Sequence, residues 1–317
     1  MPSSTSNSDA DRAGSAAWRA SLALLALTAL WFLACEAGAR FGVHRISKIE
    51  RGVHADLQAA LAVKHEPGGP RQLLSVGNSL LESALDREAF AAALAPETKS
   101  TVVVVHQTAY YDWYFGIRKL LATGSQPDAI LLMLSSEQLT LDSLRGDYSA
   151  SLLMQPVDVF EAGRTLDLHP TVQSGLLFST CSRFLGLRVE IRKAALGRLL
   201  PSVPVLLQRI APVGHKGLDL AVLENRGAER LALVKEYLDA RGIQFIFVVN
   251  PSQTLAEIEV YNRISRKVDV PILMPVGAPG ELGPDDFMAD GFHLGVSGQR
   301  KLTRALDAPV IKILSAQ

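Results

Sequence analysis

The sequence has 317 residues, of which 48% are hydrophobic and 20% are charged, and its formal net charge is zero. This composition supports a large hydrophobic core and excludes a disordered chain. Lys and Arg are scattered along the sequence, so we expect no surface for nucleic acid. The two cysteines, Cys35 and Cys181, have no partner at metal-ligand spacing. We therefore expect neither a disulfide framework nor a structural metal site.

The N-terminal part of the sequence contains one long apolar run. Residues 1–19 are rich in Ser, Asp and Ala and are predicted to be disordered. Residues 20–39 are almost all apolar, close to the ~20 residues that span a bilayer, and are predicted to be a transmembrane signal anchor. Two alternatives are a signal peptide cleaved near residues 37–39 and a lipoprotein attached at Cys35. Basic residues flank both ends of the run, so the positive-inside rule does not fix its orientation.

Residues 40–70 connect this run to the rest of the chain. Apolar residues at helical spacing within 41–63 predict a juxtamembrane helix. The sequence Glu-Pro-Gly-Gly-Pro at 66–70 then breaks the pattern, because Pro and Gly interrupt regular structure. We therefore expect a linker at this point and a separate domain over residues 71–317.

Short apolar segments alternate with helical segments from residue 71 onward. Continuous runs of Val, Ile and Leu are typical of parallel strands that are covered by helices on both faces. The strands are predicted at 72–76, 101–105, 129–134, 243–249 and 270–274. The helices are predicted at 86–95, 110–122, 220–240, 255–267 and 297–314. This order indicates an α/β fold with a doubly wound parallel sheet.

The alternation is interrupted over about residues 139–220. Several helix-like pieces, including one at 189–200, are separated here by prolines. A stretch of ~80 residues is too long for an ordinary loop in an α/β protein. We therefore predict an inserted helical subdomain.

Ser79 lies where the first predicted strand meets a helix, in the sequence Gly77-Asn78-Ser79. Ligands bind at such corners because helix N-termini present unpaired N–H groups beyond the strand ends. A serine at this position is a candidate nucleophile. The same serine, with Glu82 three residues later, also matches the S-x-x-E capping box, in which its only role is to begin the helix.

A second motif, Asp290-Gly-Phe-His293, lies in the loop before the last predicted helix. A carboxylate three residues before a histidine can reach the imidazole, fix its tautomer and stabilise the imidazolium that forms when it accepts a serine proton. In a doubly wound sheet, this loop and the corner after the first strand lie at the same edge. We therefore expect Ser79 beside the His293 ring, with Asp290 on the other ring nitrogen.

An aromatic cluster follows the second predicted strand. Its members are Tyr110, Tyr111, Trp113, Tyr114 and Phe115. Such a cluster either packs a helix against the sheet or forms a platform that stacks on sugar rings.

The two motifs together, Gly77-Asn78-Ser79 after the first strand and Asp290-x-x-His293 before the last helix, resemble the SGNH/GDSL hydrolase superfamily. The resemblance covers residue 72 to the C-terminus, apart from the insertion. It implies a flavodoxin-like (SGNH) fold without a cofactor, in which Ser79 is the nucleophile, His293 the general base and acid, and Asp290 its orienting carboxylate. A membrane segment joined to such a domain is similar to the membrane-anchored SGNH-like proteins of bacterial exopolysaccharide O-acetylation.

The sequence departs from this family at its oxyanion hole, which the family builds from the serine N–H, a glycine after the second strand and an asparagine after the third. The two loops here read His-Gln-Thr-Ala at 106–109 and Ser-Ser-Glu-Gln at 135–138, without glycine or asparagine. Each missing donor is worth about 3–4 kcal/mol of transition-state stabilisation. The candidates to replace them, or to shape the substrate site beside the serine, are Asn78, Thr108, Ala109, Ser136 and Gln138.

The resemblance implies a membrane-anchored serine acyltransferase or esterase. Its substrate would be the acyl groups, above all O-acetyl groups, of a cell-envelope or extracellular polysaccharide, and a membrane-bound acyl-donor protein would be a further partner. The domain would face the periplasm or the cell exterior. The altered oxyanion positions favour the alternative, a catalytically degenerate SGNH domain that serves as a binding or scaffold subunit in polysaccharide assembly.

Overall fold

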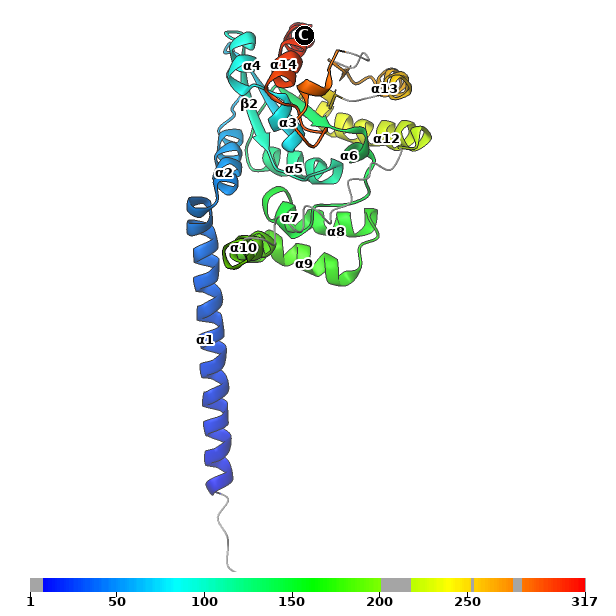
Figure 1. Cartoon of the computed structure of the whole chain (residues 1–317). Coiled ribbons are helices and arrows are strands. Elements are labelled where there is room, and N and C mark those ends of the chain that lie inside the picture. The colour runs from blue at the N-terminus through cyan, green and yellow to red at the C-terminus, as the bar shows by residue number, and fades with distance from the viewer. Residues whose placement is uncertain (1–7, 201–217, 252–253, 276–280, 317) are drawn as a thin grey trace, which may run out of the picture.

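The computed structural model describes residues 8–200, 218–251, 254–275 and 281–316 (Figure 1). Its centre is a five-stranded parallel sheet with the strand order β2-β1-β3-β4-β5. The strands are β1 (Arg71–Gly77), β2 (Thr98–Val104), β3 (Ala129–Leu134), β4 (Gln244–Val249) and β5 (Ile272–Leu273). Because this is the flavodoxin-like order, the predicted fold class is confirmed.

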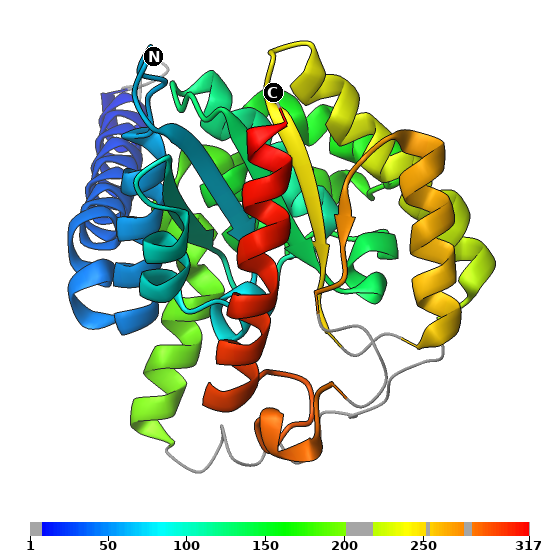
Figure 2. The same ribbon diagram turned by 90° about the horizontal axis from the view of Figure 1, so that it is seen from above.

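Helices cover both faces of the sheet, as the apolar strands require. One face packs against α2 (Lys48–Leu61), α5 (Tyr110–Ala122), α12 (Leu220–Asp239) and α13 (Leu255–Val268). The other face packs against α3 (Ser79–Ala84), α4 (Arg87–Leu94) and α14 (Val296–Ser315). Figure 2 shows α14, in red, lying across the sheet on this second face. Alternate strand residues therefore enter two separate cores.

The carboxyl ends of β2, β1 and β3 are aligned. Gly77, the last residue of β1, pairs with Val104 on β2 and with Met133 on β3. The chain segments that follow these three strands therefore begin at one edge of the sheet, which is where ligands bind in this class of fold.

The two edge strands differ from their predicted bounds. β2 begins at Thr98 rather than at 101, because polar residues pair well at an edge that solvent reaches, and Lys99 there is exposed. β5 is limited to Ile272 and Leu273. Pro271, just before it, has no N–H to donate to a neighbouring strand.

Four helices occupy the described part of the predicted insertion, after the short helix α6 (Ser136–Thr140). They are α7 (Asp147–Leu153), α8 (Pro156–Thr165), α9 (Pro170–Cys181) and α10 (Arg183–Leu199). Their small core packs on Phe115 of α5 through Ala150, Met154, Val159 and Leu176. Residues 201–217 of the predicted insertion lie outside the described residues.

The N-terminal helix α1 (Ser8–Ile46) is longer than the sequence indicated. The predicted disorder of residues 1–19 is wrong for residues 8–19, where Ala and Arg, which are good helix formers, extend the helix; residues 1–7 lie outside the described residues. Within α1, the segment Ala17–Val43 is long and apolar enough to cross a membrane. The predicted juxtamembrane helix is divided at Ser47, whose hydroxyl accepts a hydrogen bond from the Glu50 N–H and begins α2.

Candidate active site

Ser79 is the first residue of α3, immediately after the corner at which β1 ends. The corner is tight because Gly77 has no side chain. A Cβ atom there would lie 2.9 Å from both the Leu81 Cβ and the Met133 carbonyl oxygen. Glycine therefore allows α3 to begin against the sheet, with the half-buried Ser79 side chain at its exposed edge.

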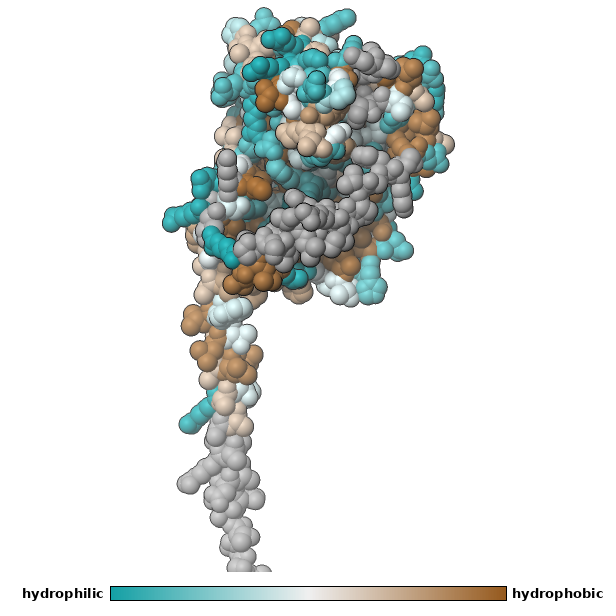
Figure 3. Space-filling view, viewed as in Figure 1, coloured by the Kyte–Doolittle hydropathy of each residue, from teal (hydrophilic) through white to brown (hydrophobic). Residues whose placement is uncertain are grey.

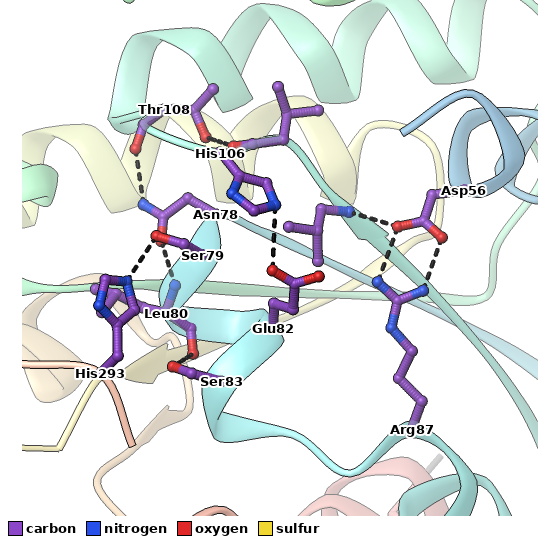
Figure 4. A network of polar contacts seen from close by, with 12 residues as sticks. Asp56, Asn78, Ser79, Leu80, Glu82, Ser83, Arg87, His106, Thr108 and His293 are labelled. Carbon is purple, nitrogen blue, oxygen red and sulfur yellow. Dashed lines mark hydrogen bonds and ion pairs between the residues drawn. The ribbon is translucent and has the colours of Figure 1, made fainter. Parts of the chain in front are cut away.

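Asn78 is the N-cap residue of α3 (Figure 4). Its side-chain oxygen accepts a hydrogen bond of 2.9 Å from the Leu80 N–H, and its side-chain N–H donates one of 2.7 Å to the Thr108 carbonyl. Asn78 is fully buried, so both contacts are made without competition from water. The capping box of Ser79 and Glu82 is therefore a wrong interpretation, and the Ser79 hydroxyl is not used to begin the helix.

Glu82 instead pairs with His106, which follows β2. The Glu82 Oε2 lies 3.1 Å from the His106 Nε2, and Figure 4 shows this pair beside the Ser79 side chain. Both residues line the cavity that contains Ser79. The fold brings them together because α3 and the loop after β2 begin at the same sheet edge.

Asp290 organises the loop that carries His293. One of its carboxylate oxygens accepts hydrogen bonds of 3.0 Å from the N–H groups of Phe292 and His293. Its other oxygen lies 2.7 Å from the His293 Nδ1. These contacts hold the pKa of Asp290 at about 2, chiefly through the hydrogen bond from the His293 side chain. The carboxylate is therefore ionised at neutral pH.

The other ring nitrogen of His293, Nε2, lies 2.9 Å from the Ser79 Oγ. Because an ionised carboxylate only accepts hydrogen bonds, Nδ1 of His293 carries the proton that faces Asp290. In the neutral ring, Nε2 is then an acceptor for the Ser79 hydroxyl. The predicted contacts of these three side chains are confirmed, whereas their catalytic roles stay a prediction.

Asp286 fixes the same loop to the start of α14. Its carboxylate accepts hydrogen bonds from the Ser297 hydroxyl and from the Lys301 ammonium, the latter at 2.7 Å. These two contacts, together with the Gly283 N–H, lower the pKa of Asp286 to about 2. The segment around His293 is thereby held at both ends.

Thr108 and Ala109, the oxyanion candidates after β2, are used in other contacts. The Thr108 hydroxyl donates to the Val105 carbonyl and accepts from the Trp113 indole N–H. The Ala109 N–H donates a hydrogen bond of 2.9 Å to the Asp112 carboxylate. Neither residue lines the cavity that contains Ser79. They stabilise the start of α5 instead.

Ser136 and Gln138, the candidates after β3, also bond elsewhere. The buried Ser136 hydroxyl accepts a hydrogen bond of 3.0 Å from the Tyr261 hydroxyl. Gln138 caps α6 through mutual hydrogen bonds with Ser135. The cavity at Ser79 is not lined by either candidate. The residue types after β3 suggested polar donors, but they did not show that the side chains of Ser136 and Gln138 point away from the cavity.

Gln107 is the residue that sequence analysis missed in this loop. Its φ is 58°, a left-handed conformation that favours glycine. Gln107 lines the same cavity as Ser79 and His293. Its N–H donates to no backbone carbonyl among the described residues.

A cavity of about 1200 Å³ opens beside the Ser79 hydroxyl. Ser79, His106, Gln107 and His293 line one part of it. Residues of α1, α2, α7, α10 and α14 and of the loop before α14 line other parts. Among the described residues, no three His, Cys, Asp or Glu side chains come together as a metal site. Beside the Ser79 hydroxyl, the lining supplies the imidazoles of His106 and His293 and the Glu82 carboxylate.

The fold and these contacts define a flavodoxin-like α/β protein with a hydrogen-bonded Ser, His and Asp at the carboxyl edge of its sheet. The sequence matches no protein-family model and no curated protein. A crystal structure of TesA is similar in fold, with 14% sequence identity, a TM-score of 0.39, and coverage of 77% of this chain and 99% of that one. A similarity at this level assigns neither a family nor an activity.

Proposed function

We propose that the protein is a membrane-anchored serine acyltransferase or esterase of the SGNH type. Ser79 is the nucleophile, His293 the general base and acid, and Asp290 the carboxylate that orients His293. The observation that carries this proposal is the unbroken chain of contacts from the Ser79 Oγ through both His293 nitrogens to Asp290. A hydroxyl at the start of a helix has other uses, but capping, the simplest of them, is performed by Asn78.

The reaction begins when the Ser79 Oγ attacks the carbonyl carbon of an acyl ester and its proton moves to the His293 Nε2. The ionised Asp290 stabilises the imidazolium. When the tetrahedral intermediate collapses, the ester C–O bond breaks and the leaving alcohol takes the proton from Nε2. The acyl group then remains on Ser79 until water or a sugar hydroxyl attacks it, with His293 again as the base.

We assign the oxyanion to the N–H groups of Ser79 and Gln107. The Ser79 N–H is at the first position of α3 and has no acceptor within its helix. Helix N-termini stabilise negative charge. The Gln107 N–H belongs to the loop that takes the place of the family's glycine, and both residues line one cavity. Two donors instead of three give a slower enzyme, since one donor is worth about 10²–10³-fold in rate.

The proposal includes an uncleaved anchor in the cytoplasmic membrane, with the domain on the periplasmic or exterior side. Glu36, near the end of the apolar segment, accepts hydrogen bonds from the Ser182 hydroxyl and from the N–H groups of Arg183 and Phe184. Cleavage near residues 37–39 would remove these contacts between α1 and α10. The proposed acyl acceptor is a cell-envelope polysaccharide, and a membrane-bound acyl-donor protein is a proposed partner.

A second candidate function is a degenerate SGNH domain that binds polysaccharide or serves as a scaffold. The observation that favours it is that Thr108, Ala109 and Ser136 make hydrogen bonds away from the cavity. Such a domain would keep the fold and lose turnover.

Labelling with a fluorophosphonate distinguishes the two functions, because this reagent reacts with an activated serine even where the oxyanion hole is poor. The full-length protein in detergent is expected to be labelled at Ser79, and Ser79→Ala to be unlabelled. Ser83→Ala is the matched control, since Ser83 lines the same cavity and its hydroxyl donates to the Leu80 carbonyl. His293→Ala should reduce the labelling rate by about 10²–10⁴-fold. A folded wild-type protein that resists labelling supports the binding function.

A further inference from the structure

The cavity beside Ser79 extends to the N-terminal helix. Four residues of α1 line it: Cys35, Gly38, Ala39 and Val43. Their spacing of three, four and eight residues places them on one face of the helix. Among the described residues, a Cβ atom added at the exposed Gly38 would have no neighbour within 4 Å. The described part of the structure therefore leaves room beside Gly38.

These four residues lie at the domain end of the segment that is apolar enough to cross a membrane. That segment, Ala17–Val43, has 27 residues, which corresponds to about 40 Å of helix. The hydrocarbon core of a bilayer is about 30 Å thick. A bilayer centred on the apolar residues would thus end near Glu36 and Arg40, which form an ion pair on α1. The lower end of the cavity is consequently at the level of the membrane surface.

Helix α10 packs beside α1 and also lines the cavity. Its apolar residues there are Phe184, Ile191 and Ala195, and its charged ones are Glu190, Lys193 and Arg198. Phe184 also contacts Trp31 and Phe32 of α1 edge to face, at ring-centroid distances of 6.3 and 5.9 Å. Figure 3 shows apolar residues, in brown, continuing from α1 onto the base of the domain. Apolar residues of α1 and α10 therefore line one side of the way from the level of the bilayer to Ser79.

The size and lining of the cavity fit a hydrocarbon chain. Its volume of about 1200 Å³ exceeds the ~300–1,000 Å³ of ordinary small-molecule pockets. An acetyl ester would fill only a small part of this volume. The aromatic residues considered as a sugar platform are not in this cavity. Three of them, Tyr110, Trp113 and Phe115, are buried in the protein core.

We infer that the cavity binds the acyl chain of a membrane lipid, with the lipid's ester carbonyl at Ser79. This inference rests on the proposed function, and it puts a lipid ester of the bilayer in the place of the acyl-donor protein proposed there. Attack by Ser79 breaks the ester C–O bond of the lipid, the lysolipid alcohol leaves with the proton from His293, and the long acyl group is carried on Ser79. Water then releases a fatty acid, or an acceptor hydroxyl takes the acyl group.

Photocrosslinking tests whether the chain enters the cavity, independently of catalysis. The full-length Ser79→Ala protein is placed in nanodiscs that contain a phosphatidylcholine with a diazirine on its acyl chain. We expect crosslinks at Ile191 and at Met288, which lines the cavity near His293. Crosslinks confined to outward residues of α1 such as Leu24 and Leu30, which are about two-thirds exposed, would overturn the inference.

Matched variants of α1 provide the second test. Gly38→Leu fills the open space in the cavity, whereas Ala37→Leu adds similar bulk on the opposite, exposed side of the same helix. Gly38→Leu should reduce the Met288 crosslink by about tenfold, equivalent to about 1.4 kcal/mol of binding. Ala37→Leu should leave it unchanged. Equal crosslinking in the two variants would contradict a chain that passes along this face.

Fluorophosphonates of different length separate the inference from the proposed function. In protein with Ser79, a hexadecyl fluorophosphonate should label faster than an ethyl one, and Gly38→Leu should slow only the hexadecyl reagent. If ethyl and hexadecyl reagents label at equal rates, Ser79 is reactive and the lipid inference fails. If neither reagent labels, the proposed function fails, and the Met288 crosslink alone decides whether the cavity holds lipid.

Discussion

The side-chain amide of Asn78 donates a hydrogen bond of 2.7 Å to the carbonyl oxygen of Thr108. This contact joins the start of α3 to the loop after β2, so that two chain segments at the sheet edge are held together by one buried side chain. An ionised aspartate at this position would carry no N–H and would not make this bond. The amide at position 78 is thus matched to the loop that faces it.

Asn78→Ala is expected to destabilise the protein by about 2–4 kcal/mol, because it removes a helix cap and leaves a buried carbonyl unpaired. Asn78→Asp should also destabilise it, through loss of the donor to Thr108. Ser79→Ala and Glu82→Ala should change stability by no more than about 0.5 kcal/mol. Urea unfolding of the four variants measures these differences. A loss of about 1 kcal/mol of stability in both Ser79→Ala and Glu82→Ala would mean that these two side chains do form the capping box.

Asp290 should make stability depend on pH in the acid range. Its pKa is about 2 in the folded protein and ordinarily 3.8. A lowered carboxylate pKa stabilises the fold above about pH 4, and this contribution is lost as the pH falls through about 2. The urea midpoints of wild type and Asp290→Asn should therefore differ above about pH 4 and converge progressively as the pH falls from about 4 to about 2. Asp285→Asn removes the same charge from this loop and is the control. A difference in urea midpoint between wild type and Asp290→Asn that stays constant from pH 7 to about pH 2 would contradict the lowered pKa of Asp290.

Gly77→Ala tests the close approach of α3 to the sheet. A methyl group there meets the Leu81 Cβ and the Met133 carbonyl at 2.9 Å, so we expect destabilisation of about 1–3 kcal/mol. Because α3 must shift, fluorophosphonate labelling of Ser79 should also slow. Gly52→Ala, in α2 with no neighbour within 4 Å, should instead stabilise the protein by about 0.5–1 kcal/mol. Similar effects of the two substitutions would show that the corner tolerates a side chain.

Gln107→Gly examines the assigned oxyanion donor. Glycine removes the strain of a left-handed residue, about 1–2 kcal/mol, while it adds entropy to the unfolded chain. We expect a net gain in stability of up to about 1 kcal/mol by thermal unfolding. The labelling rate of Ser79 should stay within about twofold of wild type, since a backbone N–H is kept. A large loss of labelling would mean that the Gln107 side chain, rather than its N–H, serves the site.

Cys181 reports the side of the membrane on which the domain lies. It is exposed at the end of α9, whereas Cys35 is half-buried within the apolar segment of α1. A membrane-impermeant maleimide added to intact cells, or to spheroplasts where an outer membrane blocks access, should label the wild type and spare Cys181→Ser. Labelling of wild type that requires lysis of the cytoplasmic membrane would place the domain in the cytoplasm.

Sequence patterns predicted the bounds of the elements whose apolar residues follow a regular local pattern. The buried strand Ala129–Leu134 and the helix Tyr110–Ala122 have their predicted bounds, because apolar runs and helical spacing are local properties. The edge strand β2 begins earlier than predicted, since pairing with β1 permits polar residues that an apolar pattern excludes. Helix α1 likewise begins before the apolar run, where helix propensity determines its start.

The sequence by itself determined the α/β fold class and the pairing of Ser79 with His293, because alternating strands and helices predict a parallel sheet and the carboxyl ends of its strands share one edge. The strand order was decided by the tertiary structure. The tertiary structure decided which hydrogen bond each polar side chain makes. Asn78 rather than Ser79 caps α3, and Ala109 bonds to Asp112. In both cases the sequence offers several polar groups of suitable type, and the packing of the chain decides which of them form the hydrogen bond. The cavity between α1 and α10 was also decided at this level, since its walls are about 150 residues apart and only packing brings them together.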